Sequence, residues 1–122
     1  MPTGTRVLLD DGVTHRAEKL TILHYNDVYN IEEHGKDPVG GAARFVNLVK
    51  SMKKENPFII FSGDAFNPSI MSTFTQGEQM PPVLNAIGTH VACVGNHDFD
   101  HGMESMDKLI KKCNFPWYLE SS

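Results

Sequence analysis

The sequence predicts an α/β protein of the doubly wound kind, in which mainly parallel strands are joined by crossover helices. Three short apolar runs each end in a polar turn, at 19–27, 58–64 and 90–98. Segments with helical spacing of apolar residues separate these runs, and parallel neighbours need such crossovers. With 122 residues, of which 40% are hydrophobic, the chain is long enough for one core.

The first strand is predicted over Lys19 to His24, which alternates weakly and then becomes apolar, as in a strand covered on both faces. His24 is expected to be a hydrogen-bonded core residue. A polar loop over 32–41 leads into a helix whose apolar face repeats at Ala42, Phe45, Val46, Val49 and Met52. Asn56-Pro57 is expected to end this helix.

The second strand is predicted over Phe58–Phe61, an apolar and aromatic run typical of an interior parallel strand. Ala65 to Gly77 is rich in Asn, Ser, Thr, Gly and Pro, and is expected to be a surface loop. A helix over Glu78 to Ile87 follows, with Pro81-Pro82 in its first turn, where amide donors are unpaired, and Gly88 at its end.

The third strand is predicted over His90 to Val94 and delivers the turn at 95–102. An amphipathic helix from Met103 to Lys111-Lys112 and a fourth strand at 115–119 complete the pattern. Residues 1–18 are expected to form a separate extended arm or hairpin before the domain at 19–122.

Charge and composition limit the possible partners. A net charge of -4 and a pI near 5.8 argue against binding to a nucleic acid duplex or an anionic membrane. No apolar run is long enough to span a bilayer, and the first residues lack the apolar region of a secretory signal. We therefore expect a cytoplasmic protein in which Cys93 and Cys113 are reduced.

The polar turns carry the functional prediction. Asp27 follows the first strand, Asp64 the second, and Asn96-His97-Asp98 the third. Since ligands of parallel sheets bind at the carboxyl ends of the strands, these side chains should lie at one edge. A single aspartate after a strand is more often a cap or a turn residue. Three such ends in order favour a metal-assisted hydrolytic site, because hard cations prefer oxygen donors.

These motifs, together with Gly40-Gly41-Ala42-Ala43-Arg44, resemble the calcineurin-like metallophosphoesterases, in particular their 5'-nucleotidase branch. The resemblance covers about 20–120 and implies the N-terminal half of a layered sandwich with two divalent cations (Mn, Zn, Fe or Mg). It implies that Asp27 binds the first cation, Asp64 bridges both and Asn96 binds the second. It further implies that His97 meets a phosphoryl or leaving-group oxygen while Asp98 orients the protonated imidazole, with Arg44 helping to position the turn.

Two features depart from the family pattern. Tyr29 stands where the family has a histidine, so a phenolate, which ferric iron accepts, is the possible substitute ligand. The family's downstream histidine motifs do not occur before Ser122. We therefore expect an incomplete phosphoesterase for nucleotides or other phosphomonoesters, inactive by itself. The alternative is an inactive scaffold whose exposed sheet edge is covered by a protein partner or by self-association.

Overall fold

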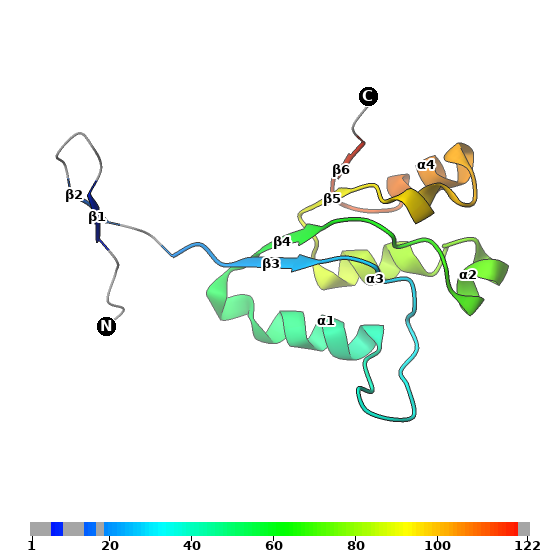
Figure 1. Cartoon of the computed structure of the whole chain (residues 1–122), viewed down its shortest axis with the longest axis horizontal. Coiled ribbons are helices and arrows are strands. Elements are labelled where there is room, and N and C mark those ends of the chain that lie inside the picture. Colours follow the sequence, from blue (N-terminus) through cyan, green and yellow to red (C-terminus); the bar gives the residue numbers. More distant parts are fainter. Residues whose placement is uncertain (1–5, 9–13, 17–18, 120–122) are drawn as a thin grey trace.

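A four-stranded parallel sheet forms the centre of the computed structural model, which describes residues 6–8, 14–16 and 19–119 (Figure 1). Its strands lie side by side in sequence order: β3 (Ile22–Tyr25), β4 (Phe58–Phe61), β5 (Val91–Cys93) and β6 (Trp117–Tyr118). All three pairings are parallel. The α/β class, the parallel sheet and the four predicted strands are thus confirmed, with β3, β5 and β6 shorter than expected and β3 ending one residue later.

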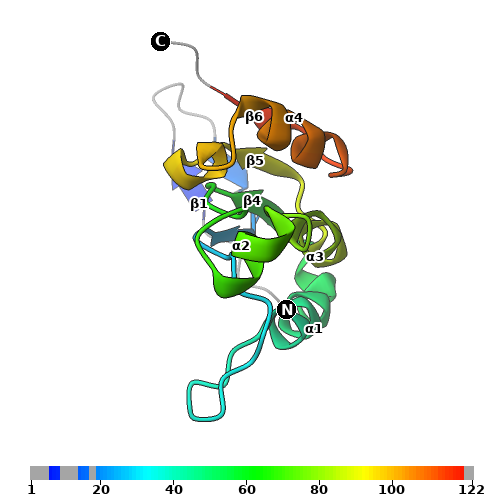
Figure 2. The same ribbon diagram turned by 90° about the vertical axis from the view of Figure 1, so that its right-hand side faces the viewer.

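The three longest helices lie on one side of this sheet (Figure 2). They are α1 (Ala42–Ser51), α3 (Met80–Ile87) and α4 (Met103–Lys111). Crossovers between parallel strands are almost always right-handed, so a sheet whose strands follow sequence order receives every helix on the same face. The doubly wound arrangement is therefore wrong, because the strand order never reverses.

The segment at 65–77 is only partly the predicted surface loop. It contains α2 (Ile70–Thr75), which begins with a capping box between Ser69 and Ser72. Ala65 and Phe66 have no exposed surface. Polar composition suggested a loop because capping residues and turn residues are the same types. Two 3₁₀ turns, η1 (Lys53–Glu55) and η2 (Asn96–Phe99), complete the helical elements.

The core lies between the sheet and its helices. Tyr25 and Phe61 point to this side of the sheet, with ring centroids 4.7 Å apart. Trp117 packs edge-on against Phe61 at 5.9 Å and stacks on Phe66 at 5.5 Å. Leu84 from α3 and other buried side chains fill the remaining space. This packing holds the parallel strands in register, so that their carboxyl ends lie at the same edge of the sheet.

The opposite face of the sheet is open to solvent in the described part of the chain. Ile22 is 54% exposed, Phe58 42% and Tyr118 68%. His24 lies on this face and pairs with the Ser62 hydroxyl. His24 is hydrogen-bonded as expected, but its predicted place in the core is wrong. One sheet face, defined here as the open face, thus lacks a covering layer among the residues described.

Two short strands precede the sheet. β1 (Arg6–Leu8) and β2 (Thr14–Arg16) pair antiparallel, as a hairpin requires. The predicted turn between them lies outside the described residues, and the domain boundary at 18/19 stays a prediction. Among the described helices, none has the length and apolarity to cross a membrane. Cys93 and Cys113 are both free thiols, as expected.

Candidate active site at the strand ends

The turns after β3, β4 and β5 meet at one edge of the sheet, as predicted. The Asp27 amide donates to the Gly63 carbonyl at 3.1 Å, which joins the first turn to the second. The His97 amide donates to Asp64 Oδ1 at 2.8 Å, which joins the second turn to the third. Asn96 precedes His97 in the same 3₁₀ turn. The three predicted cation ligands therefore come from adjoining turns.

Two of these ligands have unusual backbone geometry. Asp27 has φ 57° and Asp64 has φ 63°, which is the left-handed region that non-glycine residues rarely enter. Each follows a strand, where a further extended residue would point its side chain to one face of the sheet instead. Strained residues of this kind concentrate at functional sites, where the surrounding structure holds them.

Glycine allows the second and third turns to approach each other. A Cβ on Gly63 would lie 2.3 Å from the Gly95 nitrogen, and Gly63 also has φ 96°. A Cβ on Gly95 would lie 2.2 Å from Asp64 Oδ1. Only residues without side chains permit this contact, so the glycines place Asp64 directly against the turn that carries His97.

Asp98 is the buried anchor of the site. It is 1% exposed, and its carboxylate accepts four backbone N–H groups. Gly95 and Asp64 donate to Oδ2 at 2.8 and 2.9 Å. Ala65 and Phe66 donate to Oδ1 at 2.8 and 3.1 Å. Hydrogen bonds from four amides satisfy a buried carboxylate, and here they tie the turn after β4 to the turn after β5.

The imidazole of His97 is held by Asp100 and not by Asp98. His97 Nδ1 lies 2.8 Å from Asp100 Oδ2. The predicted orienting role of Asp98 is therefore wrong, since both of its oxygens face backbone amides. The signal in the sequence was the spacing: in a 3₁₀ turn, residues three apart lie one above the other, which pairs 97 with 100. The sequence prediction missed Asp100 and its neighbour Asn67.

The charges around His97 favour its protonated form. The hydrogen bond to Asp100 is the main cause that raises the pKa of His97 above its ordinary value, and the fields of Asp64 and Asp27 act in the same direction. The pKa of Asp100 is lowered, first by the hydrogen bond from Asn67 and then by that from His97. The protonated imidazole expected from the sequence thus agrees with the direction of these pKa shifts.

The donor set suits hard cations in type. Asp27 and Asp64 offer carboxylate oxygens and Asn96 a neutral amide oxygen, which are the ligands that Mg²⁺ and Mn²⁺ prefer. Asp64 uses Oδ1 for the His97 amide, and the hydrogen bonds among described residues leave Oδ2 available. Within the described ranges, no three His, Cys, Asp or Glu side chains gather in a group that could hold an ion. The three oxygens therefore form part of a ligand set.

Two further predicted residues lie in or near the loop after β3. Tyr29 is partly buried two residues beyond Asp27, and in the described region no hydrogen bond links its phenol to the three oxygen donors. Its role as a substitute ligand stays a prediction. Arg44 Nε pairs with Glu33 at 3.4 Å, both side chains being more than 60% exposed. Arg44 therefore contacts the loop before α1. No hydrogen bond joins it to the turn at 95–102 among the described residues, and its expected help in positioning that turn stays a prediction.

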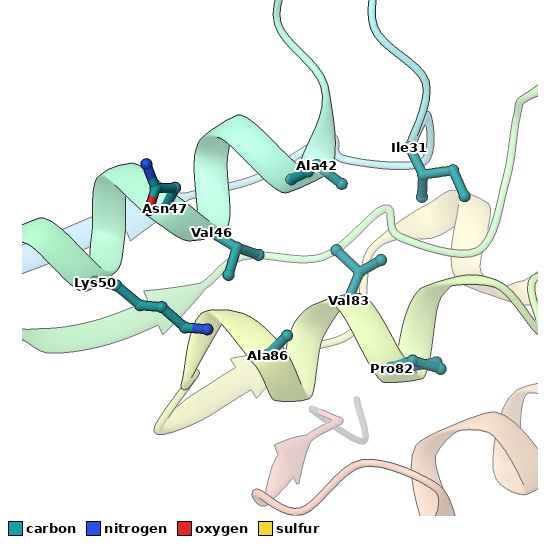
Figure 3. Close-up of a pocket in the computed structure, with 9 residues that line it drawn as sticks. Ile31, Ala42, Val46, Asn47, Lys50, Pro82, Val83 and Ala86 are labelled. Atoms are coloured by element: carbon teal, nitrogen blue, oxygen red, sulfur yellow. The ribbon is translucent and has the colours of Figure 1, made fainter.

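A hollow between α1 and α3 is a poor alternative to this site. It measures about 560 Å³ and is mostly apolar. Figure 3 shows Val46 and Val83 pointing toward one another across it, with Lys50 at one end. It offers one cation and no carboxylate or imidazole, so it has no group for acid, base or metal chemistry. The strand-end turns remain the candidate site.

Known proteins are similar to this chain in sequence and in fold. The family described as calcineurin-like phosphoesterase matches residues 20–122. The 5'-nucleotidase of Bos taurus is 34% identical over 114 residues, and the NAD 5'-nucleotidase of Haemophilus influenzae is 34% identical over 115. These alignments cover 83% and 84% of this chain but 20% and 19% of the relatives. The chain thus spans about a fifth of the length of the curated relatives it matches.

Solved structures agree with this relation. The Haemophilus influenzae NAD nucleotidase superposes with a TM-score of 0.69 at 32% identity, covering 80% of this chain and 20% of that one. A 5'-nucleotidase precursor from Thermus thermophilus gives a TM-score of 0.70 at 24% identity, covering 80% of this chain and 21% of that one. The second likeness concerns the fold alone. The four-stranded sheet and its helices are therefore an arrangement that longer proteins contain.

Proposed function

This chain belongs to the calcineurin-like phosphoesterase family, and from that premise we propose that it is a metal-dependent phosphoester hydrolase of the 5'-nucleotidase type. Nucleotides or similar phosphomonoesters are the proposed substrates. The support for this substrate class is the similarity to 5'-nucleotidases of animal and bacterial origin. Because the chain spans about a fifth of those relatives, the activity of the whole relatives is a proposal for it.

One observation supports the proposal. Asp27, Asp64 and Asn96 come from adjoining turns, and His97, whose imidazole pairs with Asp100, follows Asn96 in the third of these turns. Cations held by the three oxygen donors would supply Lewis-acid stabilisation of a phosphoryl group. The imidazole, polarised by Asp100, would donate a hydrogen bond to a phosphoryl or leaving-group oxygen. The oxygen ligands would thus bind the cations, and His97 would act as a cationic hydrogen-bond donor.

The alternative function is that of a catalytically silent scaffold. It is favoured by the absence, within the residues described, of a group of three His, Cys, Asp or Glu ligands, and by the exposure of the open face. A protein partner or a second copy would then cover this face. Apolar side chains exposed together commonly mark such a contact.

Manganese titration by calorimetry separates the two functions. We expect binding that Asp64→Asn weakens at least about tenfold, because the substitution removes a charged ligand. Asp107→Asn is the matched control, since Asp107 is an exposed aspartate on α4 paired with Lys111. Hydrolysis of p-nitrophenyl phosphate with manganese is then measured. No binding and no turnover would contradict the hydrolase and leave the scaffold.

A further inference from the structure

We propose that Asn67 and Ser72 are positioning residues, which fix the Asp100 carboxylate and thereby set the direction of the His97 imidazole. The inference rests on the proposed function, in which His97 meets the substrate. It concerns two side chains of the segment between β4 and the end of α2, a part of the chain separate from the turn that carries His97. The role follows from four hydrogen bonds that run in series.

The series begins at the histidine. Asp100 Oδ2 accepts from His97 Nδ1 at 2.8 Å and from Asn67 Nδ2 at 2.7 Å. Both bonds meet at one oxygen, so the position of that oxygen is fixed from two directions. Asn67 thus contacts the group that orients the imidazole without contacting the imidazole itself, which defines a positioning residue.

Ser72 supports the oxygen end of the Asn67 amide. The ionised Asp100 carboxylate only accepts hydrogen bonds, so the NH₂ end of the amide faces Asp100, and Oδ1 lies 2.7 Å from the Ser72 hydroxyl. The single hydroxyl proton of Ser72 is shared between this oxygen and the Ser69 carbonyl at 2.8 Å. Ser72 itself is fully buried and is tied to Ser69, whose amide donates to the Ser72 hydroxyl at 2.8 Å. The series therefore ends in the fixed capping box of α2.

A role in orientation fits better than a role in holding the two segments together. Asp98 already joins the turns after β4 and β5 by four buried hydrogen bonds. The His97 and Asp100 side chains are 44% and 36% exposed. Exposed pairs of this kind gain little stability and are free to change rotamer unless something holds them. Asn67 supplies that support on the side facing the protein.

The lowered pKa of Asp100 agrees with this arrangement, since the Asn67 hydrogen bond is its largest cause. An amide donor stabilises the ionised carboxylate and keeps it a good acceptor for the imidazole. The geometry carries the inference, and the pKa direction is consistent with it.

Nitrogen-15 NMR of the His97 ring in the full chain tests the proposal independently of activity. At a pH above its raised pKa, the neutral imidazole should hold its proton on Nδ1, facing Asp100. Asn67→Ala should move the ring signals toward a mixture of the two tautomers, and Ser72→Ala should act in the same direction. Asn85→Ala is the matched control, because Asn85 bridges α3 to the end of α4, away from the site.

A double substitution reverses the donors and acceptors at the shared position. Asn67→Asp alone places a carboxylate against Asp100 and should disturb the ring most. In Asn67→Asp combined with Asp100→Asn, the carboxylate at 67 accepts from Ser72 and from the amide nitrogen at 100. That nitrogen then takes the place of Asp100 Oδ2 and faces His97 Nδ1, so the neutral ring should hold its proton on Nε2. Ring signals of the Nε2 tautomer in the double variant would support the series, and unchanged signals in Asn67→Ala would overturn it. If Asn67→Ala fails to fold, Asn67→Asp and the double variant decide in its place, and native ring signals in both would overturn the series.

Kinetics with manganese and p-nitrophenyl phosphate separate this inference from the proposed function. Where the native chain turns over this substrate, Asn67→Ala should lower kcat about tenfold with KM changed less than about twofold, because the imidazole is misdirected while the cation ligands stay in place. Altered ring signals in a chain that has no turnover would support the positioning series and count against the hydrolase. Native ring signals with any change in kcat would overturn the series alone.

Discussion

Asp98 and Asp100 lie two residues apart in one turn and occupy different environments. Asp98 is 1% exposed and accepts four backbone amides, whereas the Asp100 side chain is 36% exposed and accepts from two side chains. The hydrogen bonds of Asp98 link backbone segments through its carboxylate, whereas those of Asp100 link side chains. The same residue type thus serves the fold at the buried end of the turn and the proposed chemistry at the exposed end.

The comparison shows how a short turn can be both rigid and reactive. Four amides around Asp98 fix where the backbone of the turn lies, so only the side chains at the exposed end need further support. His97 and Asp100 are then free to face a substrate. Residues that hold these side chains, and do not contact the substrate themselves, determine how precisely such a site is arranged.

Exchanging each carboxylate for an amide is the strongest test of this comparison. Asp98→Asn should lower the free energy of unfolding by about 4 kcal/mol, because two buried N–H groups lose their acceptor and face a donor instead. Asp100→Asn should leave the free energy of unfolding nearly unchanged, since the site is exposed. Urea denaturation followed by circular dichroism measures both.

Equal losses in the two variants would remove the distinction between the ends of the turn. If Asp98→Asn does not fold at all, the direction is as expected, and Asp98→Glu gives a measurable value for the same anchor. That variant keeps the charge and moves the oxygens by one methylene. It should therefore remain less stable than the native chain.

Glycine substitutions probe the contact beneath the anchor. Gly63→Ala should cost about 3 kcal/mol, because its Cβ would lie 2.3 Å from the Gly95 nitrogen and the backbone would have to move. Gly88→Ala is the control: Gly88 has φ 82°, but nothing lies within 4 Å of an added Cβ, so about 1 kcal/mol of backbone strain is expected. The difference between the two losses in the free energy of unfolding measures the cost of the close contact between the turns, because both positions share the strain of a positive φ. A difference below about 1 kcal/mol would contradict the close approach.

The sequence predicted the regular elements well because their signals are local. Apolar spacing located α1 and α4, and Pro81 with Gly88 marked the limits of α3. Which face of the sheet the helices cover was not predictable in the same way. It depends on the order of the strands, which is set by contacts between segments far apart in the chain.

At the site, the residue types were predictable and their partners were not. Asp27, Asp64 and Asn96 were placed correctly at one edge, because the carboxyl ends of parallel strands meet there. The roles of Asp98 and Asp100 depended on which side of the turn faces the interior. That is decided by the amides of Ala65 and Phe66, which lie more than 30 residues earlier and which polar composition had assigned to the surface.

The two cysteines give a second comparison of an exposed with a buried position, and the expected energetic effect is the smallest. Cys93 ends β5 and is exposed, whereas Cys113 follows α4, is partly buried and has its Sγ 3.6 Å from the Leu109 carbonyl. Burial raises the pKa of the Cys113 thiol. A raised pKa means less thiolate at any pH below it, so alkylation of Cys113 should begin at a higher pH than for an ordinary thiol.

With iodoacetamide at neutral pH, mass spectrometry should show Cys93 modified at least about tenfold faster than Cys113. Comparable rates would contradict the burial of Cys113. Slow modification of Cys93 at high protein concentration, relieved on dilution, would show the open face covered by a second copy, because Cys93 lies beside Tyr118 on that face.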